Sequence, residues 1–231
     1  MSHLYAPFGR AARWVVRRAV GPWKVQALEE TPAPAVFLVH HQNLFGPIHA
    51  MAYLPREVRL WVLSPFCDRK ACFEQYYGYT FTQRFGWPKL AAWAVSRLLS
   101  LLLPGFLRQF RVIPVWRGSL DIRDTLRQSQ QALARGQSLL ICPDQDYAST
   151  GEQVGQLYSG FLHLERPYCK ATGRHLPFVP LCCRRSDKTL VMGRALSFTG
   201  EKSFRQERDE LARALTQAMN ELAQAPEAAG R

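Results

Sequence analysis

The sequence predicts one α/β domain: a mixed, mainly parallel sheet with helices on its faces. Short runs rich in valine, isoleucine and leucine alternate with amphipathic helical stretches. The clearest unit is a strand over 112–116, a helix from about Asp121 that ends near Gly136, and a strand over 138–142. This strand–helix–strand order is typical of two parallel strands joined by a right-handed crossover. With 231 residues the chain can form one large core, so a single domain is expected.

The same patterns predict the remaining elements. An apolar run over 36–39 indicates a strand buried on both faces, and further strands are expected at 59–63, 177–182 and 189–192. A helix with one apolar face is expected from Ser203 to about Leu222. The apolar stretch 90–107 is interrupted by Arg97 and by Pro104, so a core helix or a partly inserted helical pair is expected there, not a full membrane span.

The first segment, Gly9 to Val20, predicts a basic amphipathic helix. At about 100° per residue its alanines and valines fall on one arc and its arginines on the other. Such a helix is typical of an anionic membrane interface, and equally of a surface helix packed on its own domain. Residues 1–30 are therefore expected to form an N-terminal helical segment, which either anchors the protein to a membrane or packs on the main domain. The main domain is expected over residues 31–225.

Composition restricts the class of partner. Hydrophobic residues make up 47% of the chain, which excludes a largely disordered protein. The net charge of +12 favours an anionic partner, and without a recognition-helix or RNA-binding motif this is expected to be an anionic membrane surface, with no nucleic acid. Six cysteines without a Cys-x-x-Cys pair, and no secretory signal, predict free thiols in a reducing cytoplasm.

Candidate catalytic residues follow the predicted strands. The strand 36–39 leads into His40-His41-Gln42-Asn43-Leu44-Phe45-Gly46-Pro47, which places an imidazole at the carboxyl edge of the sheet, where open α/β folds bind ligands. Asp144 and Asp146 follow the strand 138–142 and either support this histidine or belong to a turn. No metal is expected, because adjacent histidines on a strand point to opposite faces and no third ligand has a recognisable spacing.

Four blocks in order resemble the glycerolipid acyltransferase family, the PlsC-like lysophosphatidic acid and glycerol-phosphate acyltransferases. The family's Asn-His-x-Ser-x-x-Asp-Pro is similar to 40–47, and its apolar strand ending in arginine to 111–118. Its Phe-Pro-Glu-Gly-Thr-Arg-Ser is similar to 142–148, and its proline-bearing strand to 176–181. The resemblance implies a glycerol-3-phosphate acyltransferase-like fold.

The resemblance also implies an activity: transfer of a fatty acyl group from acyl-CoA or acyl-carrier protein to a lysophospholipid or glycerol-phosphate-type hydroxyl, at the cytoplasmic face of a membrane. No bound cofactor is implied. Histidine suits the role of general base because its pKa lies near neutrality. The implied site residues are His41 as base, Asp144 or Asp146 as its support, Arg117 as phosphate contact, and Asn43 and Gly160 in substrate binding.

The chain departs from the family pattern at the residue that should orient the base. Gly46 stands where the family has aspartate, and Tyr147 stands where the third block has arginine. By analogy with serine proteases, losing the orienting acid costs roughly 10⁴ in rate, or about 5.5 kcal/mol of barrier. The alternative interpretation is therefore a catalytically inactive lipid-binding protein on the same fold.

Overall fold

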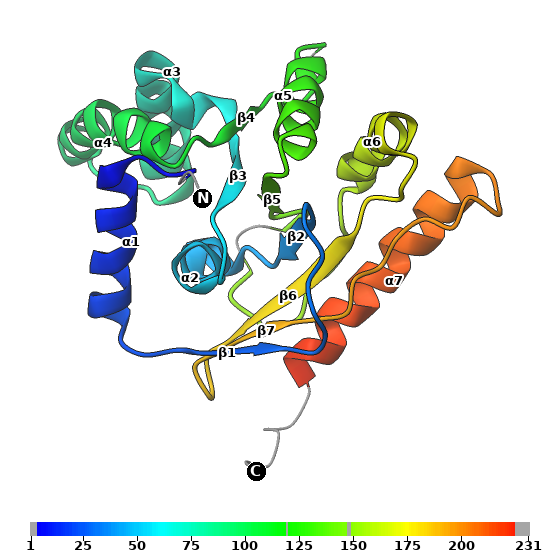
Figure 1. The fold of residues 1–231 in the computed structure, drawn as a ribbon. Coiled ribbons are helices and arrows are strands. Elements are labelled where there is room, and N and C mark those ends of the chain that lie inside the picture. Colours follow the sequence, from blue (N-terminus) through cyan, green and yellow to red (C-terminus); the bar gives the residue numbers. More distant parts are fainter. Residues whose placement is uncertain (1–3, 119, 147–148, 225–231) are drawn as a thin grey trace. The chain divides into compact units, whose positions relative to one another are not determined.

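The computed structural model describes residues 4–118, 120–146 and 149–224, and it confirms the α/β class with a mixed, mainly parallel sheet and flanking helices (Figure 1). Residue 225, the expected end of the main domain, lies outside this range. The chain divides into two compact units. The smaller contains the residues up to Ala11 and Arg59–Gln128, and the larger contains Ala12–Val58 and the residues from Ser129 onward.

The larger unit is built on strands in the order β1-β7-β6-β2-β5. Neighbouring strands are parallel except for the antiparallel pair β6–β7. Every residue of β2, β5, β6 and β7 is buried, as continuous apolar runs require in a sheet covered on both faces. The strands are β1 (Lys24–Ala27), β2 (Val36–Val39), β5 (Ser138–Ile141), β6 (Phe178–Arg184) and β7 (Thr189–Met192).

Helices cover both faces of this sheet (Figure 1). On β6, Cys182 packs with Leu222 of α7 (Phe204–Gln224), whereas the thiol of Cys183 lies 3.6 Å from the carbonyl oxygen of Gly46 in α2 (Phe45–Tyr53). Consecutive strand residues point to opposite faces, so α7 and α2 lie on opposite sides of the sheet. The unit also contains the short helices η4 (Ser159–Leu164) and α6 (Glu165–Thr172).

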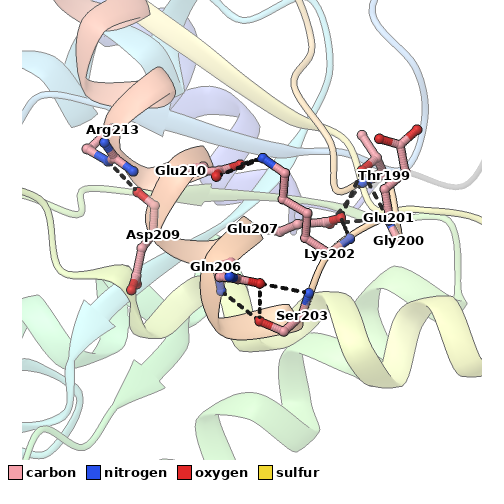
Figure 2. Close-up of polar contacts among 10 residues, drawn as sticks. All are labelled: Thr199, Gly200, Glu201, Lys202, Ser203, Gln206, Glu207, Asp209, Glu210 and Arg213. Atoms are coloured by element: carbon pink, nitrogen blue, oxygen red, sulfur yellow. Dashed lines mark hydrogen bonds and ion pairs between the residues drawn. The ribbon is translucent and has the colours of Figure 1, made fainter.

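Polar side chains fix the start of α7, as Figure 2 shows. The Ser203 hydroxyl donates to the Gln206 side-chain oxygen at 2.8 Å and accepts the Gln206 N–H at 3.4 Å, an N-terminal capping arrangement at the predicted helix start. The Glu207 carboxylate organises the preceding loop. It accepts hydrogen bonds from the N–H groups of Lys202, Thr199 and Gly200 and from the Thr199 hydroxyl. These bonds, the one from Lys202 foremost, lower the pKa of Glu207 to about 2.

The smaller unit contains the parallel pair β3 (Val58–Leu63, of which Val58 belongs to the larger unit) and β4 (Ile113–Val115). The two strands of the predicted strand–helix–strand unit, β4 and β5, do not pair with each other. Strand β4 pairs with β3, and β5 pairs with β2. Helix α5 (Ile122–Ala134) is tied to β4 by Thr125, which is fully buried. Its hydroxyl donates to the Pro114 carbonyl at 2.8 Å and accepts the Trp116 N–H at 3.4 Å. The remaining helices are η2 (Ser64–Cys67), α3 (Arg69–Glu74), the π-helix η3 (Gln75–Arg84) and α4 (Lys89–Gln109).

Helix α4 differs from the expected core helix or broken pair. It runs unbroken through Pro104. Its buried residues form a narrow stripe at every fourth position: Ala92, Ser96, Ser100 and Pro104. Most of its large apolar side chains are exposed, with Leu90 at 79% and Leu102 at 61%. Its length and composition would allow it to cross a membrane.

The N-terminal helix α1 (Pro7–Val20) forms as predicted, and part of its basic face is used within the protein. The guanidinium groups of Arg13 and Arg17 donate to the Ala52 carbonyl at 2.9 and 2.5 Å, and Arg13 also reaches the Leu54 carbonyl. These carbonyls are at the C-terminal end of α2, where positive charge is favourable. The contacts agree with the packed-helix alternative. Residues 24–27, expected in the N-terminal segment, form β1.

Candidate active site

The site begins at the carboxyl end of β2, which lies between β5 and β6 in the sheet. Leu38 is opposite Ile141 of β5, and Val39 is opposite Leu181 of β6. Parallel strands bring their carboxyl ends to one edge, so the loops after β2 and β5 meet there. The sequence prediction that the Asp144 loop neighbours the histidine strand is therefore confirmed.

The carboxylate of Asp144 bonds to both histidine positions. Its Oδ1 lies 2.9 Å from Nδ1 of His40, and its Oδ2 accepts the backbone N–H of His41 at 2.6 Å. Both Asp144 and His40 are buried, with exposed fractions of 3% and 6%. Asp144 was expected to support the imidazole of His41. In the structure it holds the His41 backbone, and the imidazole that it bonds is that of His40.

The imidazole of His41 has a different local partner. Its Nδ1 accepts the backbone N–H of Leu44 at 3.1 Å, and the ring is partly exposed. This bond closes a tight turn over 41–44. The two neighbouring histidines thus have different hydrogen-bonding environments at the same nitrogen: Nδ1 faces a carboxylate in His40 and a backbone donor in His41.

The loop after the histidines has an unusual backbone. Gln42, Asn43 and Leu44 have φ angles of +46°, +51° and +76°. Side chains other than glycine rarely adopt this left-handed region, and each such residue costs of order 1–3 kcal/mol. The Gln42 side chain is 2% exposed and donates to the Gly151 carbonyl at 3.3 Å. A strained loop beside a buried polar pair is typical of a functional site.

Gly46 is required by this backbone. A Cβ atom at position 46 would lie 1.8 Å from the His40 carbonyl oxygen and 3.2 Å from Cγ2 of Val39. No side chain fits at that distance, so the family's aspartate has no room at this position. The missing acid of the first block is a consequence of how tightly α2 approaches the end of β2.

The other expected site residues within the described ranges are all exposed. Asn43, Asp146 and Gly160 are exposed residues of the larger unit, and a Cβ added at Gly160 would meet no atom within 4 Å. Arg117 is exposed, two residues after β4 in the smaller unit. Tyr147 lies outside the described residues. The hydrogen bond from the His41 backbone N–H brings Asp144 to the histidine loop.

Three residues beside the loop were not predicted from the sequence. Strand β6 continues past the end of β2, and after it the Arg185 guanidinium lies 4.1 Å from the ring centroid of Phe45. The Arg185 N–H bonds to the Glu152 carboxylate at 3.1 Å. The sequence offers one clue to Arg185, which is its position directly after a strand that neighbours the histidine strand.

His49, the third histidine near the loop, has a structural explanation. Its Nδ1 lies 2.7 Å from the Phe45 carbonyl oxygen, and its ring packs against those of Trp23 and Phe45, with centroid distances of 4.3 and 3.9 Å. Burial lowers its pKa, and the charge of Arg185 adds to the effect. The neutral imidazole therefore packs among aromatic rings on the buried side of α2.

Among the described residues, one group has the ligand types of a metal site. Oxygen, sulfur and nitrogen atoms of Glu165, Cys169 and His175 all lie within 4.8 Å of one another. The Glu165 carboxylate is already occupied, because it bonds to Nδ1 of His175 at 2.6 Å and accepts the Leu176 N–H at 2.8 Å. These bonds account for the arrangement without an ion.

Comparison with known proteins is informative at the level of fold. No protein-family model and no curated protein matches the chain. Among solved structures, it is similar to the 1-acyl-sn-glycerophosphate (LPA) acyltransferase PlsC from Thermotoga maritima, with a TM-score of 0.51 and 12% identity over 95% of this chain and 78% of that one. The fold is PlsC-like. A PlsC-like fold is what the four sequence blocks implied, and at this identity the likeness is one of fold alone.

Proposed function

We propose that the protein is an acyltransferase that moves a fatty acyl group from a thioester to a hydroxyl. One observation carries the proposal: a buried histidine–aspartate pair, His40 and Asp144, bridges the carboxyl ends of β2 and β5 in a PlsC-like fold. A carboxylate on Nδ1 fixes the tautomer of an imidazole and stabilises its protonated form. This is the support that Gly46 cannot give.

The proposed reaction needs a base and no bound cofactor. The acceptor hydroxyl gives its proton to a histidine of the loop as its oxygen attacks the thioester carbonyl, and the thiol of the donor leaves. The sequence resemblance favours acyl-CoA or acyl-carrier protein as donor and a lysophospholipid or glycerol-phosphate-type molecule as acceptor. The resemblance favours His41 as base and Arg117 as phosphate contact.

We further propose that the protein works at the cytoplasmic face of a membrane. Helix α4 exposes the large apolar side chains of Leu90, Trp93, Leu98 and Leu102, and clusters of exposed apolar side chains mark contact sites for proteins or membranes. The net charge of +12 favours an anionic lipid surface. A helix that presents apolar side chains on a basic protein suits an enzyme whose acceptor resides in the bilayer.

A thioester-release assay tests the activity. Purified protein is mixed with long-chain acyl-CoA or acyl-carrier protein and a panel of lysophospholipid and glycerol-phosphate acceptors, and free thiol is measured. We expect release that depends on acceptor and falls by at least about 10²-fold in Asp144→Asn, since Asn cannot stabilise the imidazolium. The matched control is Asp124→Asn, an exposed aspartate paired with Arg127.

A second candidate is an inactive lipid-binding protein on the same fold. The observation that favours it is Gly46, which leaves the first block without its own acid. The two candidates differ in the same assay. Thiol release that is absent with every acceptor, together with undiminished binding to phospholipid vesicles, would favour the binding protein and contradict the enzyme.

A further inference from the structure

Hydrogen bonds hold the two neighbouring histidines in opposite tautomers. The Nδ1 of His41 accepts the Leu44 N–H, so the ring proton of neutral His41 is on Nε2. The Nδ1 of His40 faces the Asp144 carboxylate, which only accepts, so its ring proton is on Nδ1. A general base needs a free lone pair on the nitrogen opposite its carboxylate. In His40 that nitrogen is Nε2, whereas Nε2 of His41 can donate but not accept.

Two buried acceptors in this loop also lack a donor. Among the described residues, Nε2 of His40 and Oε1 of Gln42 are buried side-chain atoms without a hydrogen-bond partner. Both residues are more than nine-tenths buried and lie two positions apart. Native proteins rarely leave such atoms unpaired, and each exception calls for a water, an ion or a functional role. A ligand that donates hydrogen bonds would satisfy both.

We propose that His40, not His41, is the catalytic base and that it takes the proton of an acceptor hydroxyl which Gln42 helps to orient. The inference rests on the proposed acyltransferase function and deepens it. Asp144 is then the orienting acid of the dyad. The ligand class is a molecule with at least one free hydroxyl, and a neighbouring second donor would bond to Oε1 of Gln42.

The step balances within the two substrates. The acceptor O–H bond breaks, and its proton goes to Nε2 of His40 while its oxygen bonds to the thioester carbonyl carbon. When the tetrahedral intermediate collapses, the C–S bond breaks and the leaving sulfur takes the proton from His40. The products are an ester and a thiol, and the dyad returns to its starting state.

In this proposal the hydroxyl reaches the buried nitrogen through a change in the 42–44 loop. Gln42, Asn43 and Leu44 have positive φ angles, which are unfavourable for glutamine and leucine. Asn43 and Leu44 are exposed, so rearranging them disturbs little of the core. Bound substrate can therefore drive a local change in the 42–44 loop that opens the path to His40.

The tautomers are measured directly by nitrogen-15 NMR of the imidazole rings in the full-length wild-type protein. We expect the His40 ring proton on Nδ1 and the His41 ring proton on Nε2, with assignments made by comparison with His40→Gln and His41→Gln. A His40 proton on Nε2, or a His41 proton on Nδ1, overturns the inference. This readout needs no turnover, so it is independent of the proposed function.

Thiol release from the same variants measures the roles. We expect His40→Gln to lose about 10²- to 10⁴-fold, the usual contribution of a general base, and His41→Gln to lose less than about tenfold. His163→Gln, an exposed histidine far along the chain, is the control, and folding is checked by circular dichroism.

The outcomes separate the two proposals. Release that falls as far in His41→Gln as in His40→Gln, or that survives in His40→Gln, overturns the assignment and leaves the acyltransferase standing. If His40→Gln does not fold, His41→Gln decides: near-wild-type release supports His40, and loss of release overturns it. A wild-type protein that releases no thiol overturns the function and, with it, the base.

Discussion

Gly46 provides the sharpest test of the site geometry. In Gly46→Ala the new Cβ would lie 1.8 Å from the His40 carbonyl oxygen, although ordinary contact begins near 3.4 Å. The start of α2 must therefore move away from β2 by more than an ångström, and its obstacle is backbone that cannot rotate aside. Overpacking a core costs typically 1–3 kcal/mol, and a backbone obstacle puts this change at about 3 kcal/mol. For a chain of this size that lowers Tm by about 6–12 °C.

The measurement is urea unfolding followed by circular dichroism. Gly105→Ala is the control, because Gly105 lies within α4 and a Cβ there would meet no atom within 4 Å. The control is expected to gain up to about 1 kcal/mol from helix propensity. A Gly46→Ala protein whose free energy of unfolding stays within about 0.5 kcal/mol of wild type would refute the reasoning, since surface changes stay in that range.

The same geometry predicts the effect on activity. Gly46→Asp restores the aspartate of the family's first block, yet it carries the same Cβ and displaces the loop that positions both histidines. We expect thiol release below that of the wild type. Release above the wild-type rate would show that the loop accommodates an acid there, contrary to the close approach of α2 to β2.

Three further outcomes are expected. The pKa of Glu207 in the folded protein is about 2, below its usual 4.5, so the ionised carboxylate stabilises the fold above about pH 4.5, and this stabilisation is lost as pH falls towards 2. The difference in urea midpoint between the wild type and Glu207→Gln should therefore disappear between pH 4.5 and 2. A difference that stays constant over that range would contradict the prediction. Thr125→Val leaves the Pro114 carbonyl and the Trp116 N–H without their partner and should cost about 1–3 kcal/mol in urea unfolding, whereas the exposed Thr172→Val should cost little. The double change Leu98→Glu and Leu102→Glu on α4 should abolish flotation with anionic vesicles while leaving Tm unchanged. Undiminished flotation would show that this face of α4 does not bind the membrane.

Most of the larger sheet could be predicted because its strands carry their own signal. Continuous apolar runs mark β2, β5, β6 and β7, and Ser203 marks the start of α7 by its capping chemistry. Strand β1 could not be found this way. Its four residues are mostly exposed, and they form a strand because β7 offers a free edge in register with them.

The sequence predicts where the candidate site lies in the fold but not which of its residues are hydrogen-bonded to each other. The order of strands brings the Asp144 loop beside the histidines, and this follows from parallel topology. Which imidazole the carboxylate meets depends on the left-handed turn over 42–44 and on the close packing at Gly46. The turn has little sequence signal, because Gln and Leu do not favour positive φ. The close packing at Gly46 depends on a distance between two elements, which no local pattern encodes.

The pairing of β1 with β7 has a practical consequence for shortened versions of the protein. A chain that starts at residue 31 would lose Lys24–Ala27 and leave the outer N–H and C=O groups of β7 open to other copies, which invites aggregation. Aggregation of such a fragment would then be mistaken for a loss of membrane binding. A cut that removes α1 but spares Lys24 keeps that margin of the sheet covered and isolates what the arginine-bearing helix contributes.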